Sequence, residues 1–259
     1  MKKIFPVLSF LLFSLFGESQ KTADSPMNII GYYAGSTTAL DSFPLSKLNY
    51  LIFSFCHLKG NRLSVTNAKD TATIQKMVSL KQNIPGLKII LSLGGWGGCK
   101  DCSPVFSTKK GRKEFAASTR ELMEYFQADG IDLDWEYPVI AGFPGHPYSI
   151  DDKQNFTSLI KLLRRKLGTT YKISFAAGGF GNFIDSAIEW KKVMRRADRV
   201  NLMSYDLVHG FSTVSGHHTP LYSTSQQVES ADNGVNKLLS SGVPSKKNYN
   251  RSCFLCPFF

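Results

Sequence analysis

The stretch Asp129–Pro138, DGIDLDWEYP, carries acids at alternate positions: Asp132, Asp134 and Glu136. Three apolar residues alternate with them: Ile131, Leu133 and Trp135. Successive side chains of an extended strand point to opposite faces, so the acids share one face, with roughly 6.6 Å between neighbouring Cα atoms. On a half-exposed strand such a face would meet solvent, whereas on a strand covered on both sides the acids would share a buried space.

Short apolar runs bounded by Gly, Pro, Asn or Asp recur along the chain and predict six strands. The strands cover Asn28–Tyr33, Tyr50–His57, Leu87–Leu93, Gly130–Glu136, Tyr171–Ala177 and Arg199–Tyr205. Helical patterns predict helices over Thr71–Asn83, Thr108–Phe126, Asp151–Leu167, Asp185–Ala197 and Ser225–Ser241. The connection Ala39–Leu48 is too short to predict a helix. Strands that alternate with helices indicate a parallel sheet built from βαβ units.

Such a sheet is either open and doubly wound or closed into a barrel. An open nucleotide-binding sheet would carry a glycine-rich phosphate turn after its first strand, and Gly31–Gly35 lacks that spacing. Polar and aromatic residues instead follow the ends of several strands, where barrel enzymes have their active sites. We therefore predict an α/β fold, a (β/α)₈ TIM barrel, apparently truncated after about six βα units.

In a barrel both faces of a strand are covered, so the three acids must be enclosed. Enclosed carboxyls raise one another's pKa, and desolvation acts in the same direction, so one carboxyl can stay protonated near neutral pH. A general acid requires that state. Glu136 is the candidate acid because its side chain is the longest and it lies nearest the end of the strand. Asp134 lies one step deeper and can hydrogen-bond Glu136, and Asp132 lies deeper still.

The segment Asp129–Pro138 matches throughout the Asp-Gly-x-Asp-x-Asp-Trp-Glu-Tyr-Pro pattern of glycoside hydrolase family 18, the chitinases and chitinase-like proteins. Ser92–Trp96, SLGGW, resembles the motif of the family's third strand, and Met203–Asp206, MSYD, resembles that of its sixth. The resemblance extends over residues 28–244. It implies hydrolysis of β-1,4-linked N-acetylglucosamine polymers, with chitin or chito-oligosaccharides as partners and no metal or other cofactor.

The resemblance also implies a role for each matched residue. Glu136 would protonate the glycosidic oxygen, Asp134 would stabilise the substrate's N-acetyl group, and Asp132 would pair with Asp134. The acetyl oxygen would attack the anomeric carbon, which supplies the nucleophile that acids on one face of one strand cannot readily provide. The residues implied in substrate binding are Tyr205, Asp206, Met203, Trp96, Tyr32, Phe55 and Ser92.

Some of these residues have structural interpretations as well. Tyr32 and Phe55 fit a barrel core equally well. For Trp96, which follows two glycines, sugar stacking is favoured over packing, and Gly94 and Gly95 are expected to allow close backbone approach rather than to bind a ligand.

Two other functions compete with chitin hydrolysis. A non-catalytic chitin- or glycan-binding protein is one, because strands seven and eight are missing from the predicted pattern, although Glu136 is retained. An endo-β-N-acetylglucosaminidase acting on N-glycans is the other, and Trp135 and Tyr137 argue against it.

The ends of the chain differ from the barrel region. Residues 1–19 have the pattern of a secretory signal peptide, with Lys2 and Lys3 before the apolar run Ile4–Phe16, so we predict a secreted or periplasmic protein. Residues 20–27 form a short linker and residues 28–244 the incomplete catalytic barrel. Residues 245–259 are an atypical tail without strand alternation, as expected of a truncated or frame-shifted product.

The formal net charge of +11 would suit a nucleic-acid or membrane-surface partner. The basic residues are scattered through predicted helices without a nucleic-acid-binding motif, so we predict solvated helix faces, no nucleic-acid partner and no membrane span. The oligomeric state stays open.

The five cysteines include two Cys-x-x-Cys pairs. A four-thiolate zinc site formed by Cys99, Cys102, Cys253 and Cys256 is one interpretation. The export signal favours a local Cys99–Cys102 disulfide instead, with Cys56 as a buried apolar residue on a strand.

Overall fold

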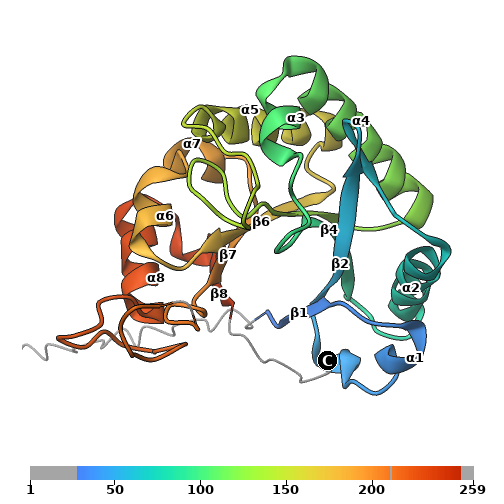
Figure 1. The fold of residues 1–259 in the computed structure, drawn as a ribbon. Coiled ribbons are helices and arrows are strands. Elements are labelled where there is room, and N and C mark those ends of the chain that lie inside the picture. The colour runs from blue at the N-terminus through green and yellow to red at the C-terminus, as the bar shows by residue number, and fades with distance from the viewer. Residues whose placement is uncertain (1–27, 211, 252–259) are drawn as a thin grey trace, which may run out of the picture.

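A computed structural model describes residues 28–210 and 212–251, and its strands form one curved parallel sheet with a short hairpin (Figure 1). The strands are β1 (Ile30–Tyr33), β2 (Tyr50–Lys59), β3 (Arg62–Ser64), β4 (Lys88–Gly94), β5 (Gly130–Asp134), β6 (Lys172–Gly178), β7 (Arg199–Met203) and β8 (Asn248–Arg251). Over the described residues the order is β1-β2-β4-β5-β6-β7-β8, and β3 pairs antiparallel with the end of β2. The expected α/β fold of a partial TIM barrel is confirmed.

Helices cover the outer side of the sheet (Figure 1). They are α1 (Thr37–Leu40), α2 (Ala68–Ser79), α3 (Cys102–Ser107), α4 (Lys109–Phe126), α5 (Asp152–Leu167), α6 (Gly181–Ser186), α7 (Trp190–Met194) and α8 (Ala231–Ser240). Single 3₁₀ turns lie at Leu45–Lys47, Leu80–Gln82 and Ser245–Lys247. None of the helices in the described ranges has both the length and the apolarity that crossing a membrane requires.

Two of the predicted helices differ from the structure. In place of the single helix expected over Asp185–Ala197 the chain forms α6, which begins earlier at Gly181, and α7, with buried Ala187 and Ile188 between them. The Trp190 indole donates to the carbonyl of Ile184 at 2.7 Å, so a side chain replaces a helical backbone partner at this break. The helix expected from Ser225 begins only at Ala231, where the Ser230 hydroxyl accepts a hydrogen bond from the Asn233 amide.

The strand β8 lies inside the segment 245–259, where the sequence pattern predicts no strand. Val200 to Met203 of β7 pair in parallel register with Asn248 to Arg251. Backbone hydrogen bonds alone make this ladder, so side-chain alternation is not required for it. The expectation that the whole segment lacks a strand is therefore wrong for its first part. The predicted signal peptide and the pair Cys253 and Cys256 lie outside the described residues.

The strands have chemically different faces. Outward side chains of β5 pack under helices: Trp135, just beyond the strand, lies 5.5 Å from Phe106 of α3 and 6.3 Å from Phe156 of α5 between ring centroids. On the inner side, near the start of the strands, the Arg199 guanidinium lies 3.8 Å from the centre of the Tyr50 ring. The main apolar core therefore lies between sheet and helices, and polar groups occupy the inner side of the sheet.

Candidate active site

Strand register brings three polar residues into one row on the inner face of the sheet. Asp132 of β5 is paired with Ser92 of β4 on one side and with Ser174 of β6 on the other. All three side chains are buried. The predicted enclosure therefore holds for Asp132, because strands flank β5 on both sides and the side chains that contact it on the inner face shield it from solvent.

Four neutral donors hold the carboxyl group of Asp132. Tyr32 and Ser92 donate to Oδ2 at 3.0 and 2.9 Å. Ser174 and the amide of Asn201 donate to Oδ1 at 2.6 and 3.1 Å. The Asn201 amide also donates to the Tyr32 hydroxyl at 2.7 Å, which links the two sides of this ring of donors. We call these four residues and Asp132 the aspartate cage, and it fixes the carboxyl group in one orientation.

Asp134 and Glu136 continue the same face toward the C-terminal edge of the sheet. Asp134 ends β5 and is buried, whereas Glu136, two residues further, is partly exposed. The backbone around them is held from both sides: the Gly95 amide donates to the carbonyl of Asp134 at 2.8 Å, and Gly142 lies against the carbonyl of Glu136. The acids thus run from a buried residue to one that solvent or a substrate can reach.

Tyr137 lies within the electrostatic reach of this acid row. Burial raises the pKa of its phenol, and the neighbouring Glu136 carboxyl adds to the rise by its charge and by a hydrogen bond. Asp134 and Tyr205 act in the same direction. Its ring is fixed by Phe180 and Phe183 at centroid distances of 5.6 and 5.4 Å. Tyr137 therefore presents a protonated hydroxyl beside the predicted general acid.

Two glycines at the end of β4 allow the backbone to approach β5 closely. Gly94 has a φ of +110°, and a Cβ atom there would lie 2.2 Å from the carbonyl oxygen of Asp134. Gly95 has a φ of +77°, and its Cβ would meet the Phe55 ring at 2.5 Å. The expectation that these glycines serve backbone approach is confirmed, and Phe55 packs on Gly95.

The residues predicted at the end of β7 occupy two environments. Met203 is buried and Tyr205 is partly exposed beside the acid row, as its effect on Tyr137 indicates. Asp206 has a φ of +56° and its carboxylate pairs with the Nε2 atom of His218. His218 also contacts Thr219 through Nδ1 at 2.7 Å. Asp206 therefore joins β7 to the loop that carries His218.

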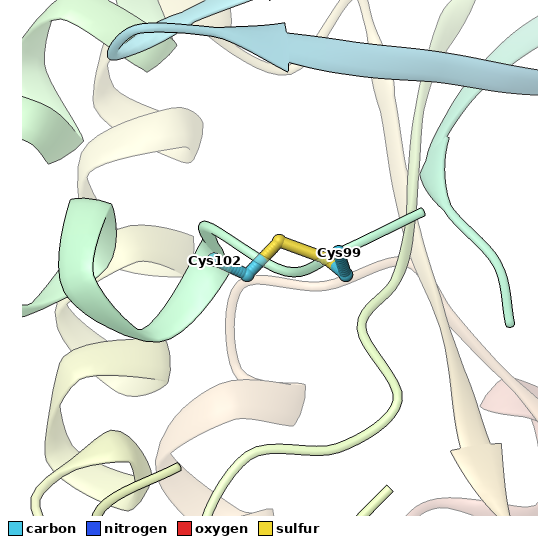
Figure 2. Close-up of a disulfide and its surroundings, with 2 residues drawn as sticks. All are labelled: Cys99 and Cys102. Carbon is cyan, nitrogen blue, oxygen red and sulfur yellow. A yellow bond between two sulfur atoms is a disulfide. The ribbon is translucent and has the colours of Figure 1, made fainter. Parts of the chain in front are cut away.

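Trp96 lies in the loop after β4, and 59% of its surface is exposed. The Cys99–Cys102 disulfide joins this loop to the first residue of α3, which confirms the favoured pairing (Figure 2). Cys56 is a buried free thiol, as expected, and burial raises its pKa. Among the described residues, no group of three or more His, Cys, Asp and Glu side chains is arranged to hold a metal ion.

Sequence reasoning missed Ser174, Asn201 and Tyr137 as members of the site. A signal exists for the first two. Ser174 interrupts an apolar strand between Ile173 and Phe175, and Asn201 precedes Met203 by two positions on the same face of its strand. The sequence does not indicate that Ser174 and Asn201 contact the same carboxyl group, because that contact depends on the register between strands.

The fold and the acid row define an α/β-barrel protein with an acidic site at the C-terminal edge of its sheet. The model of the family "Glycosyl hydrolases family 18" matches residues 28–250. Because this match covers most of the chain, the chain belongs to glycoside hydrolase family 18.

Relatives and solved structures agree with that assignment. Chitinase A1 of Niallia circulans is 36% identical over 155 residues, which is 57% of this chain but 22% of that protein's length. A family 18 N-acetylglucosaminidase from Paenibacillus barengoltzii is 34% identical with a TM-score of 0.78, over 86% of this chain and 67% of the other. The chitinase domain of the spore coat protein CotE from Clostridium difficile is 28% identical with a TM-score of 0.82, over 92% and 68% of the two chains.

Proposed function

We propose that this chain hydrolyses β-1,4-linked N-acetylglucosamine polymers, with Glu136 as the general acid and base. The observation that carries the proposal is the row of acids on one face of β5 and its extension, which runs from caged Asp132 through buried Asp134 to partly exposed Glu136. Membership of family 18 and the names of the relatives, a chitinase and an N-acetylglucosaminidase, support the same chemistry.

In the proposed first step Glu136 gives its proton to the glycosidic oxygen, and the bond between that oxygen and the anomeric carbon breaks. The carbonyl oxygen of the substrate's own N-acetyl group forms a bond to the anomeric carbon, so no second protein carboxyl is needed. Asp134 stabilises the positive charge that develops on the acetamido group. Tyr205 hydrogen-bonds that group, and Met203 lines the same position.

In the second step a water molecule attacks the anomeric carbon from the side that the leaving group has vacated. Glu136, now a carboxylate, takes the proton of that water, and the bond from the acetyl oxygen to the anomeric carbon breaks. The two inversions give a sugar that retains its configuration. Caged Asp132 acts only through Asp134, because its own carboxyl oxygens are occupied by four donors.

The first test is the release of a fluorophore from labelled N,N′-diacetylchitobioside by the wild-type chain and by Glu136→Gln. The substitution keeps the size of the side chain but removes the transferable proton, so kcat should fall by a factor of about 10² to 10⁴. Glu124→Gln is the matched control, because Glu124 is exposed on α4 and pairs with Arg120 at the surface. Equal rates for wild type and Glu136→Gln would refute Glu136 as the acid.

A further inference from the structure

Two exposed aromatic rings from different loops meet at the C-terminal edge of the sheet. Trp96 follows β4 and is 59% exposed, and Phe143 lies in the loop between β5 and α5 and is 36% exposed. Their ring centroids are 5.6 Å apart and their planes make an angle of 68°. We call this pair the aromatic corner, because the two rings present apolar surfaces in two nearly perpendicular directions.

The aromatic corner is attached to the backbone that carries the acids. Gly95, which precedes Trp96, donates its amide proton to the carbonyl of Asp134 at 2.8 Å. Gly142, which precedes Phe143, packs so closely on Glu136 that a Cβ atom would lie 2.2 Å from its carbonyl oxygen. Each ring is thus one residue away from a backbone contact with the acid row.

Phe143 is also held in place on its other sides. Gly97, with a φ of +83°, lies under it, and a Cβ there would be 3.3 Å from the ring. The His146 imidazole packs on the ring at a centroid distance of 4.9 Å. The Cys99–Cys102 disulfide closes the turn that follows Trp96 (Figure 2). The corner is therefore preorganised, which reduces the ordering that ligand binding would otherwise require.

We propose that the aromatic corner is one sugar subsite that recognises an acetylated unit, with the pyranose face on Trp96 and the acetamido methyl group against Phe143. A sugar ring has an apolar face of C–H groups, and N-acetylglucosamine carries a methyl group where glucose has only a hydroxyl. A second aromatic surface at a steep angle to the first offers that methyl group an apolar contact. This inference rests on the proposed function for the class of substrate and adds Phe143 as a specificity residue.

Intrinsic fluorescence measures binding at this corner without turnover. The chain has three tryptophans, and Trp135 and Trp190 are buried whereas Trp96 is exposed. The Glu136→Gln variant is titrated with the hexamer of N-acetylglucosamine and with cellohexaose, which is neutral and lacks the acetamido group. Phe143→Ala in that background should weaken binding of the acetylated hexamer by about two- to tenfold, with a smaller change for cellohexaose.

Two further variants keep the result interpretable. Tyr148→Ala removes another exposed aromatic ring of the same loop and should leave both affinities unchanged. Phe143→Leu keeps an apolar side chain and should recover part of the lost affinity. The proposal is overturned if Phe143→Ala leaves the affinity for both hexamers unchanged, or if it weakens the binding of both equally. It is also overturned if the acetylated hexamer does not change the fluorescence of the Glu136→Gln variant. If Glu136 proves not to be the general acid, these titrations are unaffected, because they measure binding without turnover.

Discussion

Asp132 shows how single residues set the properties of the site. Its carboxyl group is buried and forms no ion pair with any of the described residues, and four neutral donors from β1, β4, β6 and β7 satisfy its oxygens. Burial of a carboxyl is costly unless hydrogen bonds replace the lost water. The aspartate cage therefore offsets the cost of burying Asp132 and fixes the position of its carboxyl group below Asp134.

The shortest bond of the cage provides a stability test. Ser174→Ala removes the donor at 2.6 Å from Oδ1 of Asp132, which keeps the longer hydrogen bond from Asn201, so the free energy of unfolding should fall by about 1–3 kcal/mol. Urea unfolding followed by circular dichroism measures the change. Ser107→Ala is the control, because the exposed Ser107 hydroxyl donates a hydrogen bond within its own helix, to the carbonyl of Pro104. Equal free energies of unfolding for the two variants would contradict a stabilising role of the hydrogen bond from Ser174 to Asp132.

Close approach of neighbouring elements positions the backbone that carries the acids. The end of β4 touches the end of β5 through Gly94 and Gly95, and the loop after β5 returns through Gly142 to the carbonyl of Glu136. These contacts fix the backbone of Asp134 and Glu136 between two neighbours. Side chains larger than hydrogen at the glycines would push these elements apart.

Gly94→Ala and Gly86→Ala separate steric conflict from backbone strain. Both glycines have positive φ, at +110° and +85°, but a Cβ at Gly94 meets the Asp134 carbonyl at 2.2 Å whereas a Cβ at Gly86 meets nothing within 4 Å. Gly94→Ala should lower the unfolding free energy by about 1–3 kcal/mol more than Gly86→Ala. It should also reduce turnover of the labelled chitobioside. Similar losses in both variants would mean that strain alone explains the effect.

At the scale of the molecule, the sheet has central and terminal strands. Among the described residues β5 and β6 each pair with strands on both sides, whereas β1 pairs only with β2 and β8 only with β7. Backbone groups of a terminal strand have fewer protein partners and open at lower free energy than those of a central one. The site combines Tyr32 from terminal β1 with Asp132 from central β5.

Hydrogen exchange should reveal this gradient. Amides of β6 should exchange at least about tenfold more slowly than those of β1 and β8, because they open only with the centre of the sheet. Mass spectrometry of peptides that cover each strand measures the rates, and β5 serves as the internal reference. Equal protection of β1 and β6 would contradict the prediction and indicate that β1 opens together with the centre.

The sequence was most informative where a local pattern had one physical solution. Alternating acids in Asp129–Pro138 indicated a strand with an acidic face, and the helical patterns over Thr108–Phe126 and Asp151–Leu167 indicated α4 and α5, because side-chain direction follows from backbone geometry alone. The separation of α6 from α7 was missed, since a side-chain hydrogen bond from Trp190 replaces a helical backbone bond to the Ile184 carbonyl. Strand β8 was missed for a related reason, since backbone pairing with β7 needs no pattern.

The sequence alone predicted the α/β fold, a shared face for the three acids and the local disulfide, because each depends on residues near one another in the chain. The tertiary structure was needed to show which donors enclose Asp132, that Tyr137 packs on Phe180, and that Phe143 meets Trp96. Those contacts join residues from different strands and loops. Their geometry depends on strand register and on close approach at glycines, and a one-residue change in register would turn every side chain to the opposite face.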